Sequence, residues 1–119
     1  MKIVNRKTFL SMPEGTVFSK YEPCIFGNLM IKGETTKSGN DFWAQGITGA
    51  IKSDSSEERF DILLAKGKTG ESIEMDFECE GRDGLYGEEE LFAVWEIRDV
   101  KALVKRLEEA LVDGYGHEI

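Results

Sequence analysis

The segment from Glu71 to Glu80 constrains the fold more than any other part of the chain. Apolar and acidic residues alternate along it without interruption: Ile73, Met75, Phe77 and Cys79 stand between Glu74, Asp76, Glu78 and Glu80. Because successive side chains of a β-strand point to opposite faces, the alternation predicts a strand with one apolar and one acidic face. The apolar face requires a packing partner, so the segment predicts a sheet over a hydrophobic core.

A glycine-bounded turn follows this segment, in the order Gly81, Arg82, Asp83, Gly84. Glycines let the backbone approach a ligand closely, and a guanidinium can bind phosphate through two parallel hydrogen bonds. We therefore predict Arg82, with Asp83 beside it, as candidate ligand-binding residues. The alternative is a surface arginine paired with Asp83 or with a glutamate of the strand, which contributes little to stability.

The 119 residues suffice for one domain with its own core, and neither a repeat nor a linker divides residues 1–119. We predict the α+β class, with a mostly antiparallel β-sheet of about five strands. Two to three helices, including a C-terminal helix, are expected to cover one face of that sheet.

Two of these helices are predicted from their caps and their apolar spacing. Ser55 and Glu58 form a capping box that opens the first helix, and Gly67 is its expected end. Asp99 is expected to cap the last helix and Gly114 to end it. Residues expected to face the core are Phe60, Leu63 and Leu64 in the first helix, and Val100, Leu103, Val104, Leu107 and Leu111 in the last.

The last helix also carries three basic residues, Lys101, Lys105 and Arg106. Lys101 and Lys105 share a face because they are four positions apart. One interpretation is a solvated face balanced by Glu108 and Glu109. The other is a cationic patch that binds an anionic ligand at a junction between subunits, and we keep the three residues as candidate ligand-binding positions.

The net charge of −8 is unevenly distributed. Residues 1–53 hold seven Lys or Arg and four Asp or Glu (+3), whereas residues 54–119 hold eight and nineteen (−11). Such a field repels phosphates, so we expect no direct binding of nucleic acid. An acidic face for a basic partner and a local cationic pocket both remain open.

We expect a cytoplasmic protein that is not bound to a membrane. The chain holds no apolar run near the roughly 20 residues that span a bilayer, and its first residues lack the apolar stretch of a secretory signal. Cys24 and Cys79 form no metal-binding pair, and we interpret both as reduced core residues.

Catalysis and cofactor binding have little support in the sequence. His117 is the only histidine, so nucleophilic catalysis and a zinc site would both depend on one residue near the end of the chain. A hard cation at Asp83 and Glu88 to Glu90 is conceivable, but a solvated acidic rim is the more common outcome. We expect no cofactor and no enzymatic activity, with carboxylate chemistry kept as a third hypothesis.

Aromatic residues near predicted loops are candidates for stacking on a nucleotide base, which is worth about 1–3 kcal/mol per base. Tyr21, Trp43 and Tyr86 occupy such positions, whereas Phe77 and Phe92 are expected in the core. We therefore add Trp43 and Tyr86 to the predicted ligand-binding residues.

Several segments give the chain a resemblance to a known family of small phage-encoded proteins. They cover about half of the chain from end to end: Lys2 to Leu10, Pro13 to Thr16, Lys20 to Cys24, Glu80 to Tyr86 and Glu90 to Val94. In these segments the chain resembles the first family of Thoeris anti-defence proteins, which act as sponges for nucleotide signals.

The resemblance implies a specific function. Members of that family sequester the cyclic ADP-ribose signal that host TIR enzymes make on infection, without cleaving it. Some also hold cyclic oligonucleotides at a separate site, and they assemble as homo-oligomers with ligands between or near subunits. The negative charge of this chain departs from what an anion-binding protein needs, so a local cationic pocket would have to outweigh it.

The rival hypothesis is an acidic interaction module or nucleic-acid mimic that inhibits a host defence complex. Its surface would be formed by Glu74, Asp76, Glu78, Glu80 and Glu88 to Glu90. Carboxylates on one face of a strand recur about 6.6–7 Å apart, close to the phosphate spacing of a single nucleic acid strand.

Overall fold

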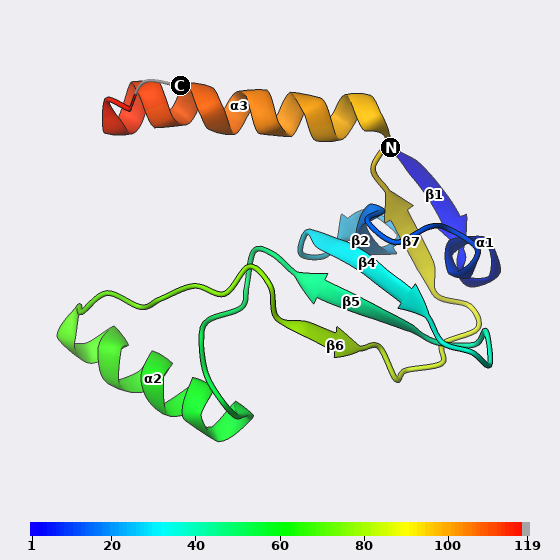
Figure 1. Cartoon of the computed structure of the whole chain (residues 1–119), viewed down its shortest axis with the longest axis horizontal. Helices are drawn as coiled ribbons and strands as arrows, with labels where there is room; N and C mark the ends of the chain where they lie inside the picture. Colours follow the sequence, from blue (N-terminus) through cyan, green and yellow to red (C-terminus); the bar gives the residue numbers. More distant parts are fainter. Residues whose placement is uncertain (118–119) are drawn as a thin grey trace.

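A computed structural model describes residues 1–117 and contains one antiparallel sheet, shown in Figure 1. The path of the sheet is β1-β7-β2-β4-β5-β6, and β3 pairs with β2 beside it. The strands are β1 (Lys2–Asn5), β2 (Val17–Glu22), β3 (Ile25–Phe26), β4 (Met30–Thr35), β5 (Phe42–Gly46), β6 (Glu80–Arg82) and β7 (Leu91–Val94). With the helices α1 (Arg6–Leu10), α2 (Ser56–Thr69) and α3 (Ile97–Tyr115), the described chain confirms the predicted α+β class.

Four phenylalanines from different elements form the centre of the core. Phe9 of α1 stacks on Phe92 of β7 with ring centroids 4.1 Å apart, and Phe18 of β2 and Phe42 of β5 surround the pair. All four side chains are fully buried. The ring centroids of Phe42 and Phe92 lie 5.8 Å apart, although β5 and β7 are not neighbours in the sheet. The sheet therefore curls around α1.

The short helix α1 is the helix that closes this core. Its start is fixed by Asn5, whose Oδ1 accepts a hydrogen bond of 2.9 Å from the backbone N–H of Thr8. This side chain satisfies one of the backbone donors that a helix leaves unpaired at its first turn. The cap therefore holds Phe9 over the sheet.

The helices α2 and α3 extend away from the sheet, as Figure 1 shows, and neither contains a buried residue. The prediction that both would cover one face of the sheet is wrong. Within the chain, the apolar positions of α2 are exposed (Phe60, Leu63 and Leu64), as are Val104, Leu107 and Leu111 of α3, while Val100 and Leu103 are partly exposed. Helical spacing shows that a helix is amphipathic, but it does not show which surface covers the apolar side.

The predicted strand from Glu71 to Glu80 is also wrong, because only its last residue belongs to β6. Met75 forms a single bridge with Ile51, and the rest of the segment has no strand partner in the described chain. Phe77, predicted in the core, is 57% exposed. The segment runs from the end of α2 back to β6 and lies outside the sheet for most of its length, so no core lies beneath its alternating pattern.

One of the two predicted helix caps is confirmed, and both predicted helix ends are wrong by two or three residues. Ser55 caps α2 by accepting a 3.1 Å hydrogen bond from the N–H of Glu58, as predicted. The helix continues through Gly67 and ends at Gly70, whose φ of 77° is the left-handed conformation that glycine adopts readily. The helix α3 likewise passes Gly114 and ends at Gly116, with φ 63°.

Three further features of the described chain bear on the sequence predictions. Asp99 does not occupy the cap position of α3, because Glu96 does, with Asp99 completing a capping box. Cys24 and Cys79 are unpaired, but both are exposed, so their prediction as core residues is wrong. Within residues 1–117, no helix combines the length and the apolar composition that a membrane crossing requires.

Candidate functional site

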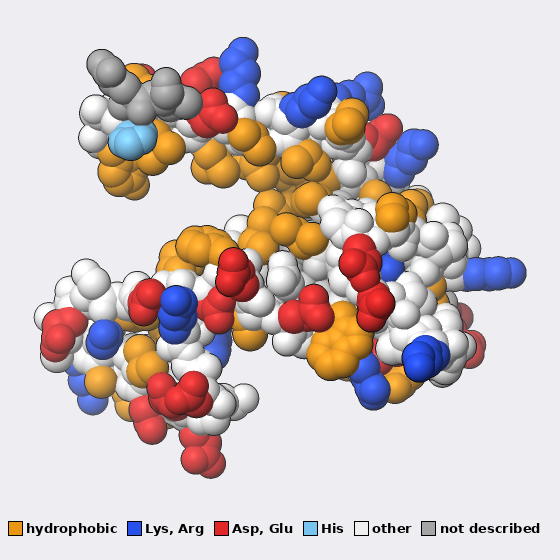
Figure 2. All heavy atoms as spheres, viewed as in Figure 1, with side chains coloured by type: hydrophobic (Ala, Val, Ile, Leu, Met, Phe, Trp, Pro, Cys, Tyr) orange, Lys and Arg blue, Asp and Glu red, His pale blue; other side chains and the backbone are white. Residues whose placement is uncertain are grey.

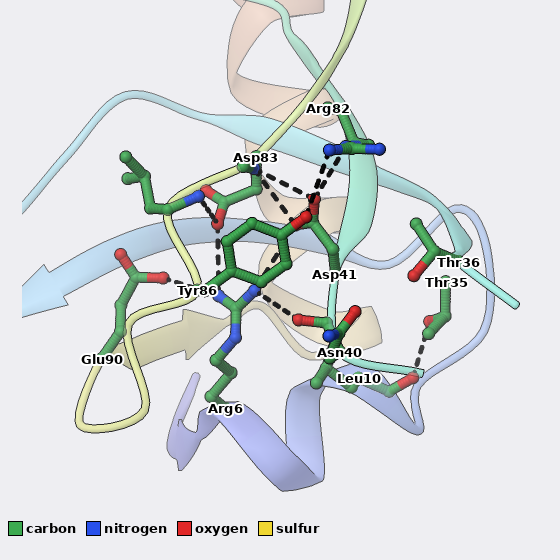
Figure 3. A network of polar contacts seen from close by, with 12 residues as sticks. Arg6, Leu10, Thr35, Thr36, Asn40, Asp41, Arg82, Asp83, Tyr86 and Glu90 are labelled. Atoms are coloured by element: carbon green, nitrogen blue, oxygen red, sulfur yellow. Dashed lines mark hydrogen bonds and ion pairs between the residues drawn. The ribbon is translucent and has the colours of Figure 1, made fainter. Parts of the chain in front are cut away.

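Arg82 lies at the end of β6, where it is held at two points of its guanidinium. Its Nε is 2.9 Å from Oδ2 of Asp41, and its Nη2 donates a 3.1 Å hydrogen bond to the hydroxyl of Tyr86 (Figure 3). The side chain is still 51% exposed. Two of the predicted ligand-binding residues, Arg82 and Tyr86, are therefore in direct contact and available at the surface.

Asp41 organises this turn from inside the protein. It precedes β5, its side chain is 1% exposed, and its two carboxylate oxygens accept hydrogen bonds of 3.1 and 3.2 Å from the N–H of Gly84. Gly84 has a φ of 65°, which is strained for residues with a Cβ atom. The predicted glycine turn is thus shaped by a buried carboxylate that binds both its backbone and Arg82.

A second, buried arginine lies behind the turn. Arg6 begins α1, and its Nη1 donates hydrogen bonds of 3.2 Å to both Asp83 and Glu90. Its Nη2 donates to the carbonyl of Asn40 at 3.0 Å and lies 3.4 Å from Oδ1 of Asp41. The strand order explains this convergence, because Asn5 pairs with Leu91 and so brings the residues that flank β1 and β7 together.

Lys20 of β2 completes the group by binding Asp83 and, at 3.2 Å, Glu90. Burial of Asp83 alone would raise the pKa of its carboxyl. The hydrogen bond and the charge of Lys20, the N–H of Leu85 and the Arg6 guanidinium together hold that pKa below its ordinary value. We call these six side chains the ionic cluster, and its three cations balance its three anions: Arg6, Lys20, Asp41, Arg82, Asp83 and Glu90.

A cavity of about 370 Å³ lies beside the ionic cluster. Its volume falls in the range of small-molecule sites, roughly 300–1,000 Å³. The residues that line it come from α1, from the loop before β5 and from the loop after β6: Arg6, Lys7, Leu10, Gly39, Asn40, Tyr86 and Glu88. Tyr86 belongs both to this wall and to the contact with Arg82, so the exposed guanidinium lies at the edge of the cavity.

Trp43 lies next to Arg82 because the two residues are directly paired between β5 and β6. Directly paired residues of antiparallel strands have their side chains on the same face, about 4.5–5.5 Å apart at Cβ. Gly33 of β4 makes room for the tryptophan, since a Cβ atom there would lie 3.1 Å from that of Trp43 and 3.0 Å from Oε2 of Glu80. Trp43 is partly exposed, so its ring can contact a ligand bound at Arg82.

The remaining predicted ligand-binding residues are placed elsewhere. Asp83 is on the turn, but its carboxylate is buried in the ionic cluster, where it supports the site from behind. Lys101, Lys105 and Arg106 are exposed on α3, which extends away from β6 in Figure 1. One chain therefore brings Arg82, Tyr86 and Trp43 together and does not bring the basic residues of α3 to them.

The sequence reasoning missed most of the ionic cluster. Arg6, Lys20 and Asp41 come from three distant segments, and nothing in the local sequence of Arg6 and Lys20 distinguishes them from surface charges. The one usable signal is Asp41, a carboxylate directly before an aromatic run. Across residues 1–117, no three side chains of His, Cys, Asp or Glu are placed to hold a metal ion together.

A larger cavity of about 460 Å³ lies at the start of α2. Ser55 and Arg59 contribute to its wall, but the Ser55 hydroxyl is already used as the helix cap and Arg59 donates to the carbonyl of Gly49 at 3.3 Å. The wall formed by α2 has no buried residue to anchor it. The cavity beside the ionic cluster is therefore the better-built site.

Comparison of the chain with protein-family models, with curated proteins and with solved structures finds no match.

Proposed function

We propose that this chain is a non-catalytic phage anti-defence protein that binds and sequesters a cyclic nucleotide signal. The signal is of the cyclic ADP-ribose type, with cyclic oligonucleotides as further ligands. The observation that carries the proposal is the grouping of Trp43, Arg82 and Tyr86, the last of which lines the cavity beside the ionic cluster. Such a protein acts in the host bacterial cytoplasm, where the signal is made.

The chemistry of these side chains suits a nucleotide. The exposed guanidinium of Arg82 and the ammonium of Lys7 on the cavity wall can donate charge-assisted hydrogen bonds to phosphate oxygens. The rings of Trp43 and Tyr86 offer faces on which a base can stack, each worth about 1–3 kcal/mol. Hydrogen bonds and stacking capture a ligand without breaking a bond in it.

The balance of charge in the ionic cluster supports binding of an anion at Arg82 despite the net charge of −8. The ionic cluster is neutral as a group, so its buried carboxylates do not repel an anion at the surface. The carboxylate of Asp41 offsets part of the positive charge of Arg82, but it also holds the guanidinium in one orientation. An arginine that is oriented before binding loses less entropy when a phosphate arrives.

One chain supplies too few contacts for stoichiometric capture. Nanomolar affinity corresponds to about 12 kcal/mol, more than two stacked rings and two cations are expected to provide. A homo-oligomer that joins two sites, or adds the basic residues of α3 from another copy, would supply the remainder.

The rival proposal, an acidic interaction module, has lost its geometric support. It depended on a regular row of carboxylates from Glu74 to Glu80, and that segment is not a strand before Glu80. Glu74 is instead paired with Lys52 at 3.1 Å, and Oδ1 of Asp76 accepts a hydrogen bond from the N–H of Glu78. The site at Arg82 is therefore the better-supported alternative.

Isothermal titration tests the proposal directly. Cyclic ADP-ribose isomers and cyclic di- and trinucleotides are titrated into the purified protein, which is then heated so that the released ligand can be examined by chromatography. We expect saturable heat with at least one ligand and its release intact. No heat with any of them would overturn the proposal, and a chemically altered product would favour the carboxylate enzyme.

A charge-reversal variant separates the sponge from the acidic module. Replacing Glu74, Asp76 and Glu78 with lysine changes the acidic segment but leaves the ionic cluster in place. We expect ligand binding to persist in this variant. If its anti-defence activity is lost while the ligand still binds, the acidic module is the working surface.

A further inference from the structure

The helix α3 exposes an apolar stripe that the described chain leaves largely uncovered, with only Val100 at its start partly buried. Its residues follow the alternating spacing of three and four positions that aligns side chains along one side of a helix: Ile97, Val100, Val104, Leu107 and Leu111. Ile97 is 76% and Leu107 58% exposed, values far above those of core residues. Figure 2 shows hydrophobic side chains gathered along the side of α3 that faces α2 across an open notch.

A stripe of this kind calls for a partner helix. Large contiguous apolar patches on soluble proteins mark interaction surfaces, and spacing of three and four positions is the pattern of two helices packed side by side. The helix has 19 residues and projects from the sheet (Figure 1), so a second helix can lie along it without meeting the strands. At about 1.5 Å per residue, the available contact is nearly 30 Å long.

The charges of α3 indicate what that partner is. Residues 97–106 carry four cations and one anion, for a charge of +3, and residues 107–115 carry three anions and no cation, for a charge of −3. A second copy of α3 in the antiparallel direction places the basic half of each helix against the acidic half of the other. A parallel copy would place like charges side by side, which is unfavourable.

The side-chain positions fit the antiparallel arrangement in detail. If Val104 of one helix packs against Leu107 of the other, the two-fold axis passes between these positions, and Val100 meets Leu111 on both sides of it. Lys101 and Glu108 lie on the same edge of the stripe, seven positions apart. In this register Lys101 of each copy faces Glu108 of the other, which gives two symmetric ion pairs. The opposite edge carries only Leu103 and Ala110 and adds apolar contact.

We propose that two copies of this chain associate through α3, packed antiparallel around a two-fold axis with Val104 and Leu107 at the centre. The inference does not depend on the proposed nucleotide site, since it rests on the apolar stripe and on the charge pattern of α3. Antiparallel packing also places the positive end of each helix dipole beside the negative end of the other.

Charge reversal and restoration test the pairing by sedimentation equilibrium at low salt. We expect the wild type to be a dimer, and Lys101→Glu or Glu108→Lys alone to weaken the dimer about tenfold, because each change creates two like-charge contacts. The double variant K101E/E108K restores attraction and should recover most of the affinity. Glu109→Lys, on the side of α3 opposite the stripe, is the matched control and should leave the affinity unchanged.

Disulfide trapping tests the direction of the helices. Both native cysteines are first removed by Cys24→Ser and Cys79→Ser. Val104→Cys is then made in one chain and Leu107→Cys in a second chain that carries a tag of different size. The two chains are mixed and oxidised. The antiparallel pair predicts a mixed cross-linked species as the main product. A dominant Val104→Cys homodimer would indicate parallel helices and contradict the proposed direction. A wild type that stays monomeric at about 100 μM would have a dissociation constant above that concentration, which would overturn the proposal altogether.

Discussion

The Nε atom of Arg82 lies 2.9 Å from Oδ2 of Asp41, so an exposed guanidinium is anchored by a carboxylate that is almost fully buried. The same carboxylate binds the N–H of Gly84 and lies 3.4 Å from Arg6. One side chain therefore sets the orientation of Arg82, the shape of its turn and the charge balance behind it. Functional groups held in this way from inside the protein lose little freedom when a ligand binds.

Replacing Asp41 with asparagine should destabilise the fold. Asparagine keeps one oxygen that can accept from Gly84, but it removes the negative charge between two arginines, and its amide group would face one of them. Loss of one partner from a buried ion pair costs about 3–5 kcal/mol, and the retained acceptor should bring the loss to the lower end. Urea unfolding measures the change. Asp61→Asn, at an exposed position of α2, is the control and should stay within about 0.5 kcal/mol of the wild type.

Asp83 should make part of the stability dependent on pH. The pKa of its carboxyl is lower in the folded protein than the ordinary value of 3.8, so the ionised form stabilises the fold above that value. This contribution is complete above about pH 5 and is lost as the pH falls below 3.8 through the pKa of the folded state. The difference in unfolding free energy between the wild type and Asp83→Asn should therefore be constant from pH 5 to 7 and shrink below pH 4. A difference that stays constant down to pH 3 would contradict the role assigned to Asp83.

The buried Lys32 should lower stability in its charged form. It is almost completely buried beside Phe9, with its Nζ donating to the carbonyl of Gly33 at 3.1 Å and to Oγ1 of Thr35 at 2.8 Å. Burial lowers the pKa of this amine below 10.5 despite the charge of Glu14. A group whose pKa is lower when folded favours the folded state more as the pH rises toward 10.5.

Lys32→Met should consequently raise the unfolding free energy by about 1 kcal/mol at pH 7, since methionine fills a similar volume without a buried charge. The gain should shrink as the pH rises toward 10.5, because the wild-type lysine loses its proton at a lower pH in the folded protein than in the unfolded chain. Thermal unfolding across this range provides the measurement, with Lys2→Met at an exposed position of β1 as the control. A variant that is less stable at every pH would show that the two hydrogen bonds of Lys32 outweigh its desolvation.

Local sequence signals predicted local structure well. The cap at Ser55, the glycine turn around Arg82 and the amphipathic character of α3 all follow from residues within a few positions of one another. These are the features for which short-range spacing determines the outcome. Arg82 and Tyr86 were each predicted as ligand-binding residues, but their contact was not predicted although only four positions separate them.

Features that depend on distant segments could not be read from the sequence. Arg6 meets Glu90 because β1 pairs with β7, and no local pattern encodes that pairing. The segment around Phe77 has a local pattern that predicts the wrong structure. Its residues alternate as in a strand, but the chain pairs it with no neighbouring strand and leaves Phe77 exposed. The stripe of α3 has the same cause, because its pattern specifies a partner that lies outside the described chain.

Arginine substitution provides the sharpest test of the nucleotide site. Arg82→Ala should weaken binding of a cyclic nucleotide by about ten- to a hundredfold, because a charge-assisted hydrogen bond to phosphate is worth roughly 1.5–3 kcal/mol. Arg98→Ala is the matched control, because it removes the same charge at a position away from the cavity. Arg98 is exposed on α3, and its Nη2 lies 3.6 Å from Oε1 of Glu96. Titration calorimetry on both variants measures the difference. Equal losses in the two would mean that Arg82 acts only through net charge, and a loss confined to Arg98 would move the site from the β6 turn to α3.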